Sequence, residues 1–154
     1  MTAKQMAQAE LVALQQIVDG VKDADTEALE KEIAQAKRIF VGGAGRSLLS
    51  MKGFAMRLMQ TGHETYLVGE VCTPSVQPGD LLIVGSGSGE TKVTLDVVNK
   101  AKGHGARVAV LTMHGNSPIA QACDCAVVLA GIPAVSPEDT EASIFAKKNL
   151  GGNF

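Results

Sequence analysis

Hydrophobic residues near the N-terminus recur at steps of three and four positions, the spacing of a helix with one buried face. The first such stripe consists of Ala9, Ala13, Leu14, Ile17, Val18 and Val21. A second amphipathic helix is expected over residues 25–36. The pattern therefore predicts that helices occupy residues 1–36.

From residue 38 onward, short apolar runs alternate with helical stretches. The runs that predict strands lie at residues 39–41, 66–68, 81–84, 107–112 and 126–129. The run at 81–84 is apolar at every position, which is typical of a strand covered on both faces. Helices between strands give parallel neighbours joined by right-handed crossovers. The expected fold is an α/β fold, an open doubly wound five-stranded parallel sheet with helices on both faces, preceded by the N-terminal helices.

Length and composition favour one globular domain. The chain has 154 residues, of which 45% are hydrophobic and 19% are charged. Its apolar runs are far shorter than the ~20 residues that a membrane span needs, so no membrane association is expected, and the cytoplasm is the expected location. We expect a single domain over 1–154, with helices over 1–36, an α/β core over 37–130 and an atypical or truncated tail over 131–154.

Charge and side-chain chemistry exclude several classes of function. The net charge is -2, no cluster of basic residues occurs, and aromatic residues make up 3%, so nucleic acid is not an expected partner. Cys72, Cys123 and Cys125 lack the spacing of a zinc site and are expected to be reduced thiols. No metal is expected.

Two glycine-rich turns follow strands. The first is Gly-Ala-Gly-Arg-Ser at 43–47, and the second is Gly-Ser-Gly-Ser-Gly-Glu-Thr at 85–91. Both precede helices, whose N-termini attract anions. The second turn offers hydroxyls at Ser86, Ser88 and Thr91, and its glycines, among them Gly87 and Gly89, permit close approach of the backbone. This predicts a phosphate site; a flexible loop with a Ser or Thr N-cap is the alternative.

The first turn is a weak match to a dinucleotide-binding fingerprint. That fingerprint needs Gly or Ala where this chain has Leu48, and an acidic residue at the end of the next strand, whereas Glu64 stands at its start. The spacing of a Walker A loop is absent as well. A dinucleotide or a nucleoside triphosphate is therefore not the favoured ligand of this turn.

Four segments, in order along the chain, resemble the sugar isomerase (SIS) domain family. They are residues 41–47, 54–59, 68–74 and 79–91. The resemblance covers about residues 37–137 and is closest to the 6-phospho-3-hexuloisomerase branch. It implies interconversion of 3-hexulose 6-phosphate and fructose 6-phosphate through an enediol(ate), within the ribulose monophosphate pathway. It also implies that no cofactor is needed and that the protein is a homo-oligomer, either a tetramer or a dimer.

The resemblance also implies roles for individual residues. The residues expected to hold the phosphate are Ser47, Ser86, Ser88 and Thr91, with Gly45 and Arg46 forming the neighbouring wall. Isomerisation needs a group that removes a proton beside the carbonyl. Glu70 follows the strand at 66–68 and is the candidate base, with a solvated loop glutamate as the alternative, and Thr73 is expected to line the substrate. Glu90 is expected to point outward and stabilise the helix dipole.

The chain departs from the family pattern after Leu129, where a Phe-Glu segment and a long apolar helix are expected but residues 136–154 differ. Three hypotheses remain open. The chain is an active phosphosugar isomerase, a phosphosugar-binding SIS module without catalysis, or another aldose-ketose phosphate isomerase such as one acting on arabinose 5-phosphate.

Overall fold

The computed structural model describes residues 2–129, 131 and 137–150, which form two compact units. One unit, Lys22–Val128, contains the sheet, and the other combines Met1–Val21 with Leu129–Phe154. Whether the chain folds as the single domain expected from its length stays a prediction. The expected tail falls partly on residues 130, 132–136 and 151–154, which lie outside the described residues.

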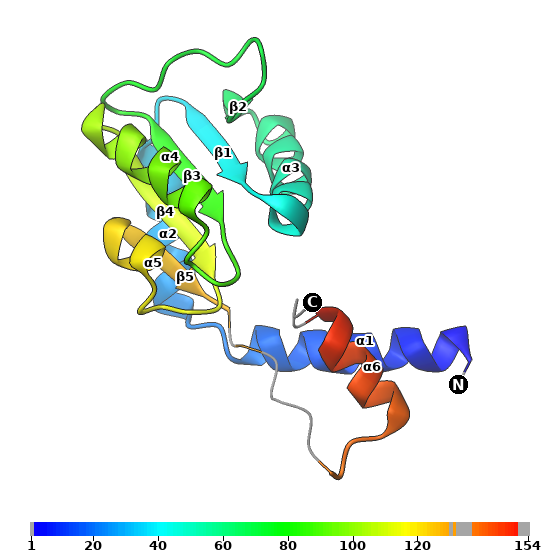
Figure 1. Cartoon of the computed structure of the whole chain (residues 1–154). Coiled ribbons are helices and arrows are strands. Elements are labelled where there is room, and N and C mark those ends of the chain that lie inside the picture. The colour runs from blue at the N-terminus through cyan, green and yellow to red at the C-terminus, as the bar shows by residue number, and fades with distance from the viewer. Residues whose placement is uncertain (1, 130, 132–136, 151–154) are drawn as a thin grey trace. The chain divides into compact units, whose positions relative to one another are not determined.

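The larger unit is built on five parallel strands in the order β2-β1-β3-β4-β5 (Figure 1). Their bounds are β1 Ile39–Gly43, β2 Thr65–Leu67, β3 Leu81–Gly85, β4 Arg107–Thr112 and β5 Cys125–Val128. The predicted five-stranded parallel α/β sheet is thus confirmed. The order reverses direction between β1 and β3, because the chain passes from β1 outward to β2 and then returns to the other side of β1.

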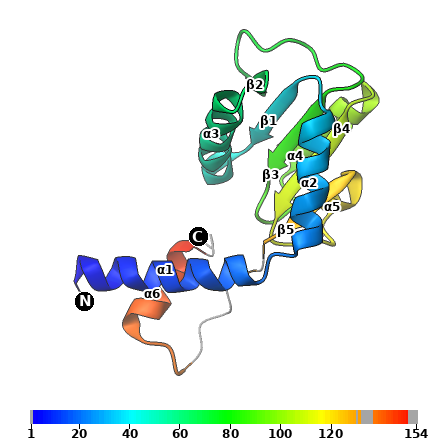
Figure 2. The same cartoon turned by 180° about the vertical axis from the view of Figure 1, so that it is seen from behind.

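Helices cover both faces of this sheet. They are α2 Asp23–Gln35, α3 Gly45–Gln60, α4 Lys92–Gly103 and α5 Pro118–Ala122. Figure 1 shows α4 and α5 in front of the sheet, and Figure 2 shows α2 over the opposite face. Side chains alternate between faces along a strand, so Leu82 and Val84 pack with Val98 of α4, whereas Gly85 faces Met51 of α3.

The connection from β2 to β3, residues 68–80, contains no helix. Its far end is held by Asp80, which is 2% exposed and accepts hydrogen bonds from Arg38 Nε at 3.1 Å and from the Gln77 N–H at 2.8 Å. The guanidinium of Arg38 also donates to the Ser75 carbonyl at 3.2 Å. The hydrogen bond to Asp80 raises the pKa of Arg38, so its guanidinium stays charged. The loop is therefore fixed where it meets the sheet.

The second unit contains two helices, α1 Ala3–Asp19 and α6 Glu141–Leu150, which pack against each other. Thr2 begins α1 with a capping box, in which its hydroxyl accepts from the Gln5 N–H. The sequence pattern did not predict α6. The Ser143 N–H donates to the Thr140 hydroxyl at 3.2 Å at its start. Among the described residues, no helix is both long enough and apolar enough to cross a membrane.

Candidate phosphate-binding site

The two glycine turns lie side by side at the carboxyl edge of the sheet. Gly43 at the end of β1 is the register partner of Gly85 at the end of β3. A Cβ on Gly43 would lie 3.0 Å from the Gly85 carbonyl oxygen, and one on Gly85 would lie 2.7 Å from Met51 Cγ and 3.7 Å from Ser47 Cβ. The absence of side chains at these two glycines thus lets the first turn of α3, with Ser47, approach the turn between β3 and α4.

The hydroxyl groups of the β3–α4 turn accept hydrogen bonds from the turn itself. Ser86 is 3% exposed, and its Oγ accepts from the Gly89 N–H at 3.2 Å. The Oγ of exposed Ser88 accepts from the Glu90 N–H at 3.3 Å. A serine hydroxyl that accepts a bond still has its own proton to donate. Both hydroxyls therefore remain able to donate a hydrogen bond to another group.

Thr91 occupies the N-cap position of α4, yet its side chain makes no capping hydrogen bond. Thr91 therefore holds the cap position without the side-chain hydrogen bond of a capping threonine, and the phosphate site and the loop with a Ser or Thr N-cap remain the two interpretations of this turn. Leu95 donates to the Thr91 carbonyl at 3.0 Å, the first bond of the helix, so the preceding amides of the first turn have no partner within the helix. Such amides favour an anion at this end of α4.

Three main-chain hydrogen bonds fasten the turn to β4 and to the segment that follows β4. They run from the Ser86 N–H to the Leu111 carbonyl at 3.0 Å, from the Met113 N–H to the Gly87 carbonyl at 3.2 Å, and from the Ile119 N–H to the Gly89 carbonyl at 3.0 Å. The position of the turn is thus set by the neighbouring strand as well as by its own glycines.

Two buried hydroxyl groups that the sequence analysis did not assign to the site complete this support. Thr112 is 1% exposed, donates to the Gly87 carbonyl at 3.4 Å and accepts from the His114 N–H at 3.2 Å. Ser117 is 6% exposed, and its Oγ lies where a Cβ on Gly89 would be, well inside van der Waals contact. Ser117 is also the N-cap of α5, where its Oγ accepts from the Ala120 N–H at 3.4 Å.

Glu70 and Thr73 lie in the turns that follow β2. The Glu70 carboxylate is 55% exposed and pairs with Lys52 Nζ of α3 at 3.1 Å, and the Thr73 hydroxyl donates to the Leu67 carbonyl. Gly45 and Arg46 begin α3 at the carboxyl end of β1, and both are exposed. The structure thus brings Ser47 close to the β3–α4 turn, and it places Glu70 beside α3.

The next features are the side chains that could bind a metal ion and the cysteine thiols. Within the described ranges, no group of three or more His, Cys, Asp or Glu side chains could hold a metal ion. Burial raises the pKa of Cys123 to about 12, which keeps that thiol protonated and unreactive near neutral pH. Cys72 is exposed.

The two turns lie at the place where sheets of this kind bind their ligands. Ligands of doubly wound sheets bind where the strand order reverses, and in the order 2-1-3-4-5 that point lies between β1 and β3. Both turns follow these strands. The model of the SIS domain matches residues 32–146, and the chain belongs to this family.

Similar proteins carry one recurring name. The chain is 42% identical over 118 residues to the 3-hexulose-6-phosphate isomerase of Methylomonas aminofaciens, covering 77% of this chain and 65% of that protein. It is also 42% identical over 113 residues to the enzyme of the same name from Bacillus subtilis, covering 73% and 61%. The chain therefore spans somewhat less than two thirds of the length of these relatives.

A solved structure extends this likeness to the fold. The crystal structure of a hypothetical protein from Methanococcus jannaschii, described as inferring a function of 3-hexulose-6-phosphate isomerase, superposes with a TM-score of 0.70 at 31% identity. The match covers 96% of this chain and 81% of that one. The SIS-type α/β fold expected from the sequence is thereby confirmed.

Proposed function

We propose that this chain binds a phosphosugar at the carboxyl edge of its sheet and interconverts 3-hexulose 6-phosphate and fructose 6-phosphate. The observation that carries the proposal is the pair of turns at the switch point, with the hydroxyls of Ser86, Ser88 and Thr91 on one side and Ser47 on the other. Relatives at 42% identity that are named for this reaction support the choice of substrate.

The site suits a phosphate that must be bound and then released. Hydroxyl groups, main-chain amides and the N-terminus of α4 supply donors without a full positive charge at every oxygen. Ser88 and Thr91 contact the phosphate from the helix side in this proposal, and Ser47 contacts it from α3. Gly45, Arg46, Gly87 and Gly89 form the surrounding backbone and wall.

Transfer of the carbonyl from C3 to C2 requires one proton to leave a carbon beside the carbonyl and one to return to its neighbour. We assign this transfer to Glu70, whose carboxylate is exposed at the carboxyl side of β2 and is positioned by Lys52. The proton moves to the carboxylate as the enediol(ate) forms and returns to the adjacent carbon as it collapses. Thr73, in the same connection, lines the sugar.

The experiment is an isomerase assay with fructose 6-phosphate, run in deuterated water. Turnover with deuterium entering the sugar beside the carbonyl is expected, because the proton exchanges at the enediol(ate) stage. Glu70→Gln is expected to lower turnover by about 10²- to 10⁴-fold, the usual contribution of a positioned base, while binding of fructose 6-phosphate persists. Glu90→Gln, at the start of α4, is the matched control and is expected to retain turnover.

A second candidate function is a phosphosugar-binding module that lacks catalysis. It is favoured by the exposed Glu70–Lys52 pair, since a solvated glutamate of this kind also serves as an ordinary surface ion pair. Binding of fructose 6-phosphate without turnover or deuterium entry would establish it. A panel that includes arabinose 5-phosphate decides between the isomerase activities.

We also propose that the chain forms a homo-oligomer through α3. Leu49, Met56 and Met59 on this helix are 71%, 52% and 54% exposed, and open space surrounds Gly53 between them. Such a face allows close approach of another helix. Light scattering should give a mass above that of one chain, and Met56→Lys should lower it.

A further inference from the structure

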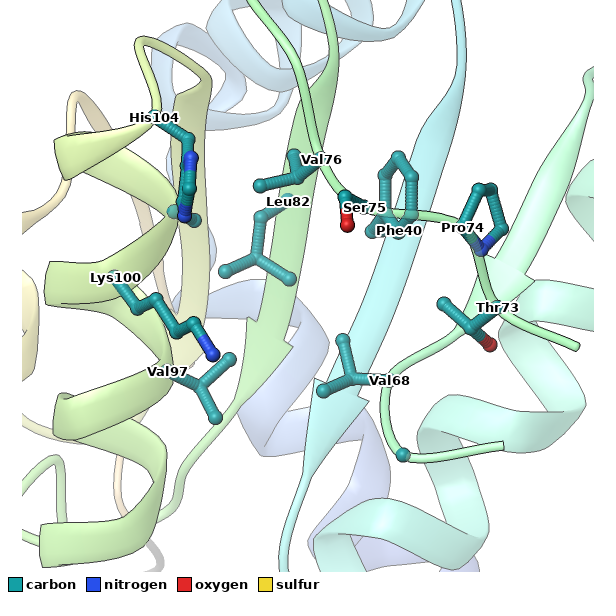
Figure 3. Close-up of a pocket in the computed structure, with 12 residues that line it drawn as sticks. Phe40, Val68, Thr73, Pro74, Ser75, Val76, Leu82, Val97, Lys100 and His104 are labelled. Atoms are coloured by element: carbon teal, nitrogen blue, oxygen red, sulfur yellow. The ribbon is translucent and has the colours of Figure 1, made fainter. Parts of the chain in front are cut away.

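A cavity of about 250 Å³ lies beside the C-terminal half of α4, over the face of the sheet that includes Phe40 and Leu82 (Figure 3). It exists because the connection from β2 to β3 is a loop, which leaves this part of the sheet without a second helix next to α4. Lys100, which lines it, lies roughly 13 Å along α4 from Thr91 at ~1.5 Å per residue. The residues that line the cavity include none of the glycine turns, and they share only Thr73 with the residues assigned to the sugar.

The lining combines an apolar floor with two basic side chains. Phe40, Val68, Leu82 and Val97 supply hydrocarbon surface, while Lys100 extends into the space from α4 (Figure 3). His104 lines the same side one turn further along. No Asp or Glu occurs among the lining residues that the structure describes.

Lys100 differs from the neighbouring lysine in having no partner. Within the described part of the chain, its ammonium group makes no hydrogen bond or ion pair, whereas Lys102 donates to the Ala122 carbonyl at 2.7 Å and pairs with Asp124 at 3.4 Å. Lys100 and His104 are both exposed at the rim of the cavity, so an anion whose apolar body lies on the floor can reach them.

The loop wall opposite α4 is held in place without a ligand. Arg38 donates to the Ser75 carbonyl at 3.2 Å near one end, and the Thr73 hydroxyl donates to the Leu67 carbonyl near the other. Both ends of this loop are hydrogen-bonded to the sheet region. Binding of a ligand therefore costs little conformational entropy in this wall.

We propose that this cavity binds a small amphipathic anion, namely a carboxylate on a short hydrocarbon chain. Its volume of about 250 Å³ lies just below the range of typical small-molecule pockets, which suits a short-chain ligand. The carboxylate pairs with Lys100 and His104, and the hydrocarbon chain lies on Phe40, Leu82 and Val97. The proposal does not depend on isomerase activity.

The test is a titration of the whole chain with hexanoate, followed by the shifts of its backbone amide resonances. Saturable shifts are expected at Val97, Lys100 and His104, with the amides of residues 86–91 unaffected. Hexanamide, which has the same shape without the charge, should bind at least about tenfold more weakly. Inorganic phosphate, which has the charge without the hydrocarbon chain, should also bind at least about tenfold more weakly at these residues.

Two variants isolate the charge and the space. Lys100→Met keeps the hydrocarbon stem and should weaken hexanoate binding about tenfold, whereas Lys31→Met on α2 makes the same change in net charge and should leave it unchanged. Val97→Phe should abolish binding by filling the cavity, with circular dichroism checking its fold. Equal affinity for hexanamide or phosphate, equal effects of the two lysine variants, or shifts that never saturate would each overturn the proposal. Ser88→Ala should leave hexanoate binding intact even if phosphosugar binding fails.

Discussion

The turns after β1 and β3 have similar glycine content and lie at the same edge, yet they are supported differently. The β3–α4 turn is hydrogen-bonded to β4 and to the segment after it, and Gly89 within it is buried against Ser117. The turn after β1 is close to Gly85 at Gly43, but it is open at Gly45, where nothing lies within 4 Å of an added Cβ. Gly89 thus meets a need for space, whereas Gly45 meets chiefly a need for backbone conformation.

The largest effect should come from an added methyl group. Gly89→Ala places a Cβ against Ser117 at a φ of +67°, so both overlap and strain oppose folding, and the free energy of unfolding should fall by about 2–5 kcal/mol. Gly45→Ala, at a φ of +54° in open space, should cost only about 1–2 kcal/mol. Urea unfolding of both variants measures the difference. Equal losses would show that the two turns are equally crowded.

The second largest effect should be a loss of affinity for the phosphosugar. Ser88→Ala removes a hydroxyl that we propose contacts the phosphate, and loss of a hydrogen bond to a charged group should weaken fructose 6-phosphate binding about 10- to 100-fold. Cys72→Ala, an exposed change in the connection after β2, is the control and should stay within about twofold. Calorimetry of binding gives both values. If the two variants lose affinity alike, the hydroxyls of the β3–α4 turn do not hold the phosphate.

Removal of one hydroxyl that holds the β3–α4 turn in place should have a smaller effect, on stability and on affinity. Thr112→Val removes the hydroxyl between the Gly87 carbonyl and the His114 N–H, and the free energy of unfolding should fall by about 1–3 kcal/mol. Affinity for fructose 6-phosphate should fall with it, because the turn is then less well positioned. Thr112→Ser should restore both. Restored stability without restored affinity would contradict a positioning role.

The smallest expected effect is a difference in amide hydrogen exchange between the two turns. The Met113 and Ile119 amides, which donate to the β3–α4 turn, should exchange slowly with solvent in the free protein, whereas the amides of residues 45–47 should exchange faster. Fructose 6-phosphate should then slow exchange mainly at 45–47, where more freedom remains to be lost. Hydrogen exchange measured with and without the sugar tests this; greater slowing at Met113 would reverse the comparison.

Much of the sheet could be predicted because its strands are apolar at nearly every position. The runs at β3 and β4 identify buried strands without any knowledge of their neighbours. The helix α6 could not be predicted in this way, since its polar start resembles a loop and its burial comes from packing against α1. The roles of Thr112 and Ser117 could not be predicted either. Each contacts a glycine of the β3–α4 turn that lies more than 20 residues earlier in the sequence.

The amino-acid sequence by itself determined the alternation of strands and helices, the two glycine turns and the hydroxyl groups that point to phosphate, because each depends on local pattern and residue chemistry. Only the tertiary structure decided that the register of β1 with β3 brings Ser47 beside Gly85, that Glu70 pairs with Lys52, and that a helix-free connection leaves a basic cavity beside α4. These features arise from contacts between distant segments, whose geometry no local pattern specifies.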